Sequence, residues 1–277
     1  TEAAKATQVS AFLSDMLEGA GPSVARGRDA ALLREVLDRT AERVKNELAG
    51  QPDVAAGIEQ VLGRTYLQIG DLLAAEQHAR SAYAMRRKAH RGRHRDVASD
   101  LSLLAETQWR RDRLAAADSL GREALEMWRA LEKGPHEGTA QALTMLGGIH
   151  LDASKIESAE PLLRDGLAMS QALHPDGHRM VAVGLNSLGN LMHYSGRFEQ
   201  ADSLQRLALA MHRRISGEWS PDVQTDLFNL AAVEVDRGRF AAAESLALLG
   251  LAVGDRIYTE PHPDQAGGLL ILAGVYL

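Results

Sequence analysis

The chain has 277 residues, of which 45% are hydrophobic and only 4% aromatic, with no cysteine and a formal net charge of −6. The missing cysteines exclude disulfides, thiolate metal sites and a cysteine nucleophile, and the negative net charge gives no general electrostatic reason to bind nucleic acid. Alanine and leucine favour helices, whereas strand-forming aromatic residues are scarce, so the composition predicts an all-α fold.

The first 27 residues are expected to form an amphipathic helix and a linker. Residues 5–18 place apolar side chains on one helical face, and residues 19–27 are rich in glycine with one proline. The apolar side chains are Val9, Phe12, Leu13, Met16 and Leu17. Residues 28–50 predict a capping helix, because apolar residues recur at helical spacing from Leu33 to Leu48.

A step of 42 residues organises the remaining chain, residues 51–277, into five full units and a truncated sixth. One series is acidic and follows an alanine: Glu76, Asp118, Glu160, Asp202 and Glu244. A second series is Leu62, Leu104, Leu146, Leu188, Leu230 and Leu272. Each unit is expected to be two helices, because leucines lie on one helical stripe over residues 185–192, Gly196 interrupts the pattern, and residues 198–211 resume it.

These residues resemble the tetratricopeptide repeat. The leucine followed by a small residue, Ala201 after the turn and Ala208 seven residues later match its motif, and the 42-residue step resembles its kinesin light chain variety. The resemblance implies an α-α superhelix, a solenoid of helix pairs from about residue 51 to the end. Asp112 and Ser154 replace the turn glycine in the second and third units, so we expect these units to be less regular.

His94-Arg95-Asp96 matches the opening of the protein kinase catalytic loop, H-R-D-x-x-x-x-N. The repeat places His94 in register with three other histidines that follow a turn between units: His136, His178 and His262. Leu101 stands where the loop needs asparagine, and the sequence has no glycine-rich phosphate loop and no Asp-Phe-Gly. We therefore predict no catalytic residue and no enzymatic activity for this fragment.

The order of helix, linker, helix and repeats nevertheless resembles the region that follows the kinase domain, and often a membrane helix, in many bacterial serine/threonine kinases. This resemblance implies that the chain is the docking or sensor region of such a kinase. The longest apolar stretch, residues 266–277, is too short to cross a bilayer. We expect a soluble fragment without direct membrane insertion. The sequence leaves open whether its parent is anchored in a membrane, and on which side of the membrane the fragment lies.

Two histidine pairs and one basic stretch are the other candidates for chemistry. His90 and His94, like His174 and His178, are four residues apart, but glycine and proline make both stretches loops, so we predict no metal site. The basic residues 85–95 indicate a helix C-terminus and a turn rather than a nucleic-acid site, because no aromatic residue lies among them. We expect no cofactor.

The family resemblance implies that the first helix of each unit lines a concave groove. The candidate binding residues are Arg64, Gln68, Ser102, Glu106, Trp109, Arg110, Thr144, Asp152, Asn186, Asn190, His193, Tyr194, Thr225, Phe228 and Asp236. Asn186 and Asn190 lie on one helical face, where their amides can bond the main chain of an extended peptide; solvated polar residues are the alternative. Trp109 is either an anchor for a partner or buried against a neighbouring unit.

We therefore expect a non-catalytic module that binds a peptide or a partner surface in this groove. The alternative is a regulatory domain that senses a small molecule or brings kinase chains together as dimers. Residues 267–277, GGLLILAGVYL, form a first helix without its second. We also expect this end to associate with another chain or to be poorly ordered.

Overall fold

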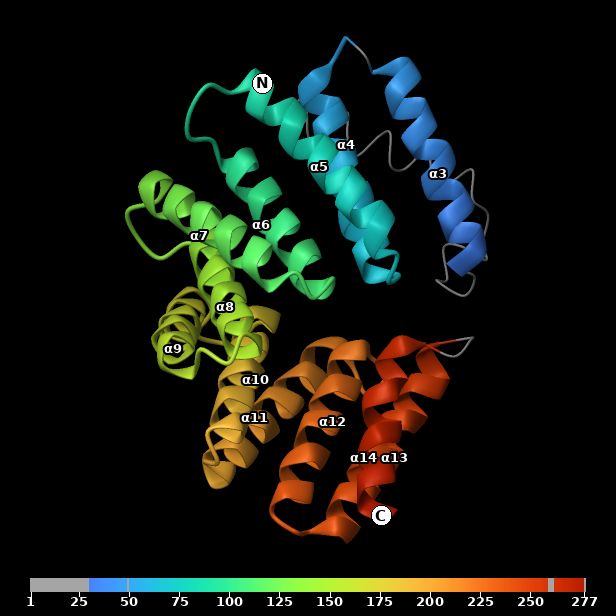
Figure 1. Ribbon diagram of the computed structural model, residues 1–277, viewed down its shortest axis with the longest axis vertical. Coiled ribbons are helices and arrows are strands. Elements are labelled where there is room, and N and C mark those ends of the chain that lie inside the picture. The colour runs from blue at the N-terminus through green and yellow to red at the C-terminus, as the bar shows by residue number, and fades with distance from the viewer. Residues whose placement is uncertain (1–29, 49, 259–261, 277) are drawn as a thin grey trace. The chain divides into compact units, whose positions relative to one another are not determined.

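The computed structural model describes residues 30–48, 50–258 and 262–276. These residues form twelve α-helices, one short 3-10 helix and no strand, which confirms the all-α prediction for this part of the chain. They divide into two compact units, one ending at residue 134 and the other beginning at residue 135. Figure 1 shows each unit as a succession of helix pairs. The helix and linker expected over residues 1–27 lie outside the described residues.

The first unit consists of one single helix followed by two helix pairs. Its helices are α3 (Ala30–Glu47), α4 (Pro52–Gln68), α5 (Leu72–Ala89), α6 (Arg95–Arg110) and α7 (Leu114–Leu131). α4 packs against α5 and α6 against α7, while α5 and α6 join the two pairs and α3 lies against α4. Each helix therefore contacts mainly its neighbours in sequence, as in other repeat folds.

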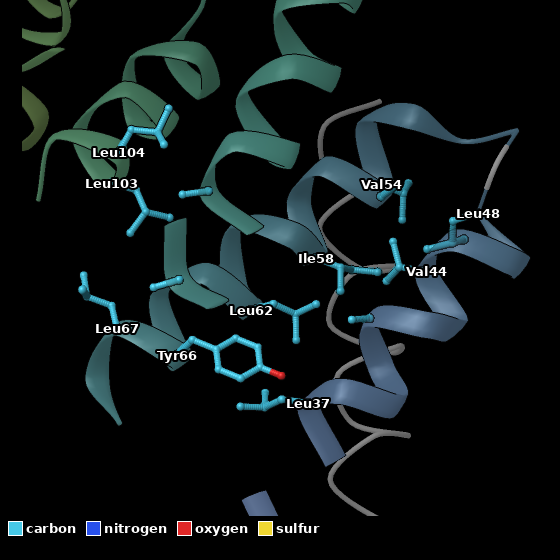
Figure 2. Packing of buried hydrophobic residues seen from close by; sticks show 14 residues of the cluster. Leu37, Val44, Leu48, Val54, Ile58, Leu62, Tyr66, Leu67, Leu103 and Leu104 are labelled. Atoms are coloured by element: carbon cyan, nitrogen blue, oxygen red, sulfur yellow. The ribbon is translucent and has the colours of Figure 1, made fainter. Parts of the chain in front are cut away.

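The core of the first unit shows why α3 has an apolar face. Leu37 and Val44 of α3 belong to the same buried cluster as Ile58, Leu62 and Tyr66 of α4, and Figure 2 shows these side chains pointing toward one another. Burying each large aliphatic side chain contributes about 1.5–3 kcal/mol. α3 thus covers the face of α4 that has no preceding helix pair to pack on.

The second unit contains three helix pairs and a last helix. Its elements are α8 (Glu137–Asp152), α9 (Ile156–Leu173), α10 (Arg179–Tyr194), α11 (Phe198–Ser216), α12 (Pro221–Asp236), α13 (Phe240–Ile257), η1 (Pro263–Gln265) and α14 (Ala266–Tyr276). α14 packs against α13 and α12 and leaves Leu269 and Leu270 exposed. This end is a helix, and its association with another chain stays a prediction.

The turn between the two helices of a 42-residue repeat is the same in all five full repeats. Gly70, Gly196 and Gly238 have φ between 71° and 80°, and Asp112 and Ser154 adopt φ of 58° in the same turn. In both the second and the third repeat, the first helix has 16 residues and the second has 18. The expectation that these units are less regular is therefore wrong, because the packing of the two helices holds the turn in the left-handed region against the local preference of the side chain.

Small residues let the paired helices approach each other. A Cβ atom on Gly189 of α10 would lie 2.7 Å from Cγ of Gln205 on α11. A Cβ atom on Gly147 of α8 would lie 2.6 Å from Leu163 on α9. Any larger residue at these positions pushes the helices apart, and such overpacking costs about 1–3 kcal/mol.

The repeated histidines begin the first helix of their units. In α6, α8 and α10 the N-cap residue is a histidine whose Nδ1 accepts a backbone N–H two residues later, from Asp96, Gly138 and Met180 respectively. Ser220 caps α12 in the equivalent position. The His-Arg-Asp sequence is therefore the start of a helix, and His94 caps α6.

Candidate functional site

Two candidate residues of the second unit, Asn186 and Asn190, belong to a polar network between α10, α11 and α12. Asn186 of α10 donates to Oδ1 of Asp226 on α12 over 2.5 Å. Its own Oδ1 accepts from Asn190, at 3.3 Å, and from Asn229 on α12, at 3.2 Å. Gln205 of α11 donates to Oδ1 of Asn190 over 2.9 Å. We call Asn186, Asn190, Gln205, His212, Asp226 and Asn229 the amide network.

A buried carboxylate is the centre of the amide network. Asp226 is almost fully buried, and its Oδ2 lies 2.6 Å from Nδ1 of His212. Burial raises the pKa of Asp226, against the opposing effect of the hydrogen bond from His212. Because Asn186 of α10 and His212 of α11, the preceding helix pair, both hold this carboxylate of α12, the network fixes the amides of α10 relative to α12.

The exposed edge of the same surface carries an aromatic residue. His193 of α10 lies 2.6 Å from Oδ2 of Asp236 on α12, which ties the ends of the two helices together. Tyr194 follows it with 67% of its area exposed. Tyrosine is one of the residue types that commonly form the hot spots of a binding surface.

The amide network retains donors and acceptors for a ligand. The Oδ1 atom of Asn186 accepts two hydrogen bonds and is saturated. Asn190 uses one of its two N–H donors, and Asn229 uses one N–H and leaves its carbonyl oxygen unused. Asn190 and Asn229, more than Asn186, can therefore bond an extended main chain.

Two of the candidate residues are buried instead of lining a surface. Thr144 of α8 is 9% exposed and lies against the helix that follows it, because a Cβ atom on Gly166 would come within 2.6 Å of its Oγ1. Phe228 of α12 is 8% exposed, with its ring against Gly250 and Gly268. The prediction that they face a groove is wrong, because small residues on the neighbouring helices leave room into which both side chains turn.

The remaining candidates lie on the first helices of their repeats, outside the amide network. Arg64 and Gln68 of α4, Arg110 of α6, Asp152 of α8 and Thr225 of α12 are exposed, and Ser102, Glu106 and Trp109 of α6 are half-buried. Ser102 accepts from Nε1 of Trp128 on α7 over 3.4 Å, so it is engaged within its own unit. Among the candidates, the structure joins Asn186 to Asn190 on α10 and His193 of α10 to Asp236 of α12.

Sequence reasoning missed Asp226, His212, Asn229 and Gln205. The repeat contains a signal for the first two, because Asp100 and Arg86 stand 126 residues earlier, three repeat steps, and keep the same spacing. Arg86 Nη1 lies 2.6 Å from Oδ1 of Asp100 in the first unit. At these positions, in each compact unit, a buried carboxylate and a basic side chain of the preceding helix thus join two successive repeats.

The other chemical candidates have structural roles. His90 stacks on His94 and His174 on His178, with ring centroids 3.8 Å and 4.1 Å apart. Among the residues that the structure describes, no group of three or more His, Cys, Asp or Glu side chains could hold a metal ion. Two arginines of the basic stretch, residues 85–95, lie beside carboxylates. Arg86 is buried beside Asp100, and Nε of Arg95 lies 2.6 Å from Oε1 of Glu132. Within the described ranges no helix is both long enough and apolar enough to span a membrane.

Helix pairs repeated at a constant step, joined by one kind of turn and by polar contacts between neighbours, define a helical-repeat protein. Family models described as tetratricopeptide repeat match residues 53–130, 96–172 and 181–222, which together are more than half of the chain. The chain belongs to the tetratricopeptide repeat family. No curated protein matches its sequence significantly.

Solved structures with the same fold include kinesin light chain-like proteins. BtubC (BKLC) from P. vanneervenii has a TM-score of 0.63 and 24% identity, over 85% of this chain and 96% of that one. A kinesin light chain from Podosopora anserina with nearly identical TPR-like repeats has a TM-score of 0.55 and 16% identity, over 76% and 99%. The Rap conjugation gene regulator of plasmid pLS20, in complex with the Phr* peptide, has a TM-score of 0.63 and 15% identity, over 79% and 63%.

Proposed function

We propose that this chain is a non-catalytic interaction module that binds an extended peptide segment across α10 and α12. The amide network carries the proposal, because it holds Asn190 and Asn229 in fixed positions with unused hydrogen-bonding groups. Ordering these side chains before binding reduces the conformational entropy that a ligand must offset. Tyr194 offers apolar area beside them.

The comparison with known folds supports a peptide ligand. A protein of the same fold is solved in complex with the Phr* peptide. Main-chain groups of an extended peptide match amide side chains, which both donate and accept, so affinity arises without a strict demand on the peptide's side chains. The half-buried position of Asn190 and Asn229 strengthens such bonds relative to those on an open surface.

Peptides selected from a random displayed library against the full chain provide the probe for this proposal. We expect Tyr194→Ala and Asn190→Ala each to weaken binding of a selected peptide by about tenfold, because each removes a central contact. Fluorescence anisotropy with the labelled peptide measures the affinity. Ser203→Ala, an exposed position on α11, is the matched control and should bind as the original chain does.

Tyr194→Ala is the decisive variant, because Tyr194 is exposed and its loss leaves the packing of the unit intact. If both variants keep the melting temperature and the affinity of the original chain, the ligand does not bind across α10 and α12. Trp109→Ala in α6 then tests whether the candidates of the first unit form the site instead.

The proposal extends to the protein from which the chain derives. The helices and repeats resemble the region after the kinase domain of bacterial serine/threonine kinases, and we propose that the module docks partners for such a kinase. The gene sequence upstream of the codon for Thr1 tests this directly. A kinase domain there supports the proposal, and a different domain contradicts it.

A further inference from the structure

A hollow of about 720 Å³ opens on the first unit, away from the amide network. One wall is formed by Asp71, the N-cap of α5, and by Leu73, Glu76 and Arg80 in the first half of that helix. Arg111 and Arg113, in the turn between α6 and α7, form the other wall. All of these residues belong to one compact unit. The hollow lies beside the turns inside the units rather than on the faces of α4 and α6 that carry the candidate residues.

Three arginines surround one buried carboxylate at the base of this hollow. Glu76 is 4% exposed, and Arg80 Nη2 and Arg113 Nη1 lie 2.5 Å and 3.3 Å from its Oε1. Arg111 contacts its other oxygen. A single carboxylate neutralises only one guanidinium, and each guanidinium has five N–H donors, so most of the donors of Arg80 and Arg113 remain available.

The second carboxylate on the wall does not neutralise the remaining charge. Asp71 accepts from the N–H of Ala74 as the N-cap of α5, over 3.2 Å, and pairs with Nε of Arg34 on α3 at 3.3 Å. Four guanidinium groups therefore face two carboxylates. The side chains of Arg80 and Arg113 are 64% and 49% exposed, so the excess positive charge lies where a ligand can reach it.

The repeat supplies an internal comparison for this site. Three steps later, 126 residues on, the same positions hold Asp202, Arg206, Arg237 and Arg239. There two further carboxylates are present: Glu234 lies 3.2 Å from Arg237 and 3.6 Å from Arg239, and Glu199 lies 3.6 Å from Arg237. Glu160 and Arg197 stand in the positions of Arg34 and Asp71 and pair at 3.1 Å. The counterpart therefore has four arginines and four carboxylates and is neutral.

The hollow of the first unit lacks both of these additional carboxylates. Gln108 stands in the position of Glu234, and Leu73 in that of Glu199. Gln108 is almost fully buried; its Oε1 accepts from Arg113, and its Nε2 has no hydrogen-bond partner. Leu73 is 70% exposed at the edge of the hollow. The fold therefore tolerates carboxylates at both positions, and in the first unit they are replaced by groups without charge.

We propose that this hollow binds a phosphate monoester on the side chain of a peptide, with an apolar residue of that peptide against Leu73. The forked donors of Arg80 and Arg113 match the geometry of phosphate oxygens, and a dianion balances the excess charge of two. This proposal is independent of peptide binding across α10 and α12, because it concerns another surface and other residues.

The test compares three probes on the full chain, first at one ionic strength and then with added salt. They are a short synthetic peptide with one phosphoserine beside a leucine, its unphosphorylated twin, and inorganic phosphate. We expect the phosphopeptide to bind at least about tenfold more tightly than either of the others, and its affinity to fall with added salt. If the unphosphorylated peptide binds as tightly as the phosphopeptide, the phosphate does not contribute to binding and the proposal is wrong. If inorganic phosphate binds as tightly, neither Leu73 nor the rest of the peptide contributes, and the proposed peptide ligand is wrong.

Two substitutions introduce the charges of the neutral counterpart. Leu73→Glu, at an exposed position, and the isosteric Gln108→Glu should each weaken phosphopeptide binding about tenfold, because they add a carboxylate beside the arginines. Gln141→Glu makes the same change in net charge at an exposed position of α8 and should leave binding unchanged. Melting curves check that Gln108→Glu is folded. Undiminished binding by the folded Leu73→Glu variant overturns the proposal.

Discussion

Single residues in this chain take backbone and charge states that local rules disfavour. Asp112 and Ser154 stand in the left-handed region at φ of 58°, where Gly70 and Gly196 stand in other units. A non-glycine residue there costs about 1–2 kcal/mol. The strain is tolerated because the helices on either side of the turn are held by their packing.

Ser154→Gly is therefore expected to raise the free energy of unfolding by about 1 kcal/mol, since the strain exceeds the entropy that glycine adds to the unfolded chain. Urea denaturation followed by circular dichroism measures the change. The reverse substitution, Gly196→Ser, should lower stability by a similar amount, because a Cβ atom there meets nothing within 4 Å and only the backbone conformation is tested. Equal stability of both variants and the original chain would show that the turn is not strained.

Asp100 is the second residue in a disfavoured state. It is fully buried, and burial raises its pKa to about 7 even though Arg86 beside it lowers the pKa. Between about pH 4 and pH 7 the folded chain therefore holds a proton that the unfolded chain releases. The resulting stability is fully present below pH 4 and is lost as the pH rises through 7.

Comparison with Asp100→Asn isolates this effect. As the pH rises from about 4.5 to 7.5, the original chain should lose stability relative to the variant, by at most about 1.4 kcal/mol per pH unit. Urea denaturation of both proteins across this range measures the difference. If the ion pair with Arg86 governed Asp100 instead, the difference would be flat here and would change only as the pH falls below 4.

The first helices of four successive repeats each begin with a side-chain N-cap. A histidine Nδ1 atom caps α6, α8 and α10, and Ser220 caps α12. The repeat predicts that these four positions are equivalent but not what they do, because histidine is not among the residues that usually accept at an N-cap. An extended backbone at the cap brings Nδ1 to the free N–H of the first turn.

His136→Ala should lower the free energy of unfolding by about 1 kcal/mol, because an N–H in the first turn of α8 loses its acceptor. His136→Ser should restore most of that loss, since serine performs this role at the equivalent position of α12. Chemical denaturation of both variants measures the two changes. If the alanine and serine variants are equally destabilised, the imidazole acts through other contacts and not as a cap.

At the scale of the whole molecule, the helices and their pairing can be predicted from the periodicity of the sequence. The residues of the candidate binding site can be predicted from it only in part. Leucine spacing located each helix pair, because packing in a repeat array is local and each helix contacts its sequence neighbours. Asn190, His193 and Tyr194 were predicted together because they lie on one helix. Asp226 and Asn229 were missed, and Thr144 and Phe228 were misplaced, since side-chain direction depends on which neighbouring helix has glycine.

The tolerance of the intra-unit turn for Gly, Asp and Ser has a consequence for the history of the chain. When one backbone recurs in five repeats, the surface residues of one repeat can change while the other repeats preserve the fold. The basic hollow and its neutral counterpart, 126 residues apart, differ in this way. Duplication thus separates the evolution of recognition from the evolution of folding, and each copy serves as an inherited reference against which the chemistry of another can be judged.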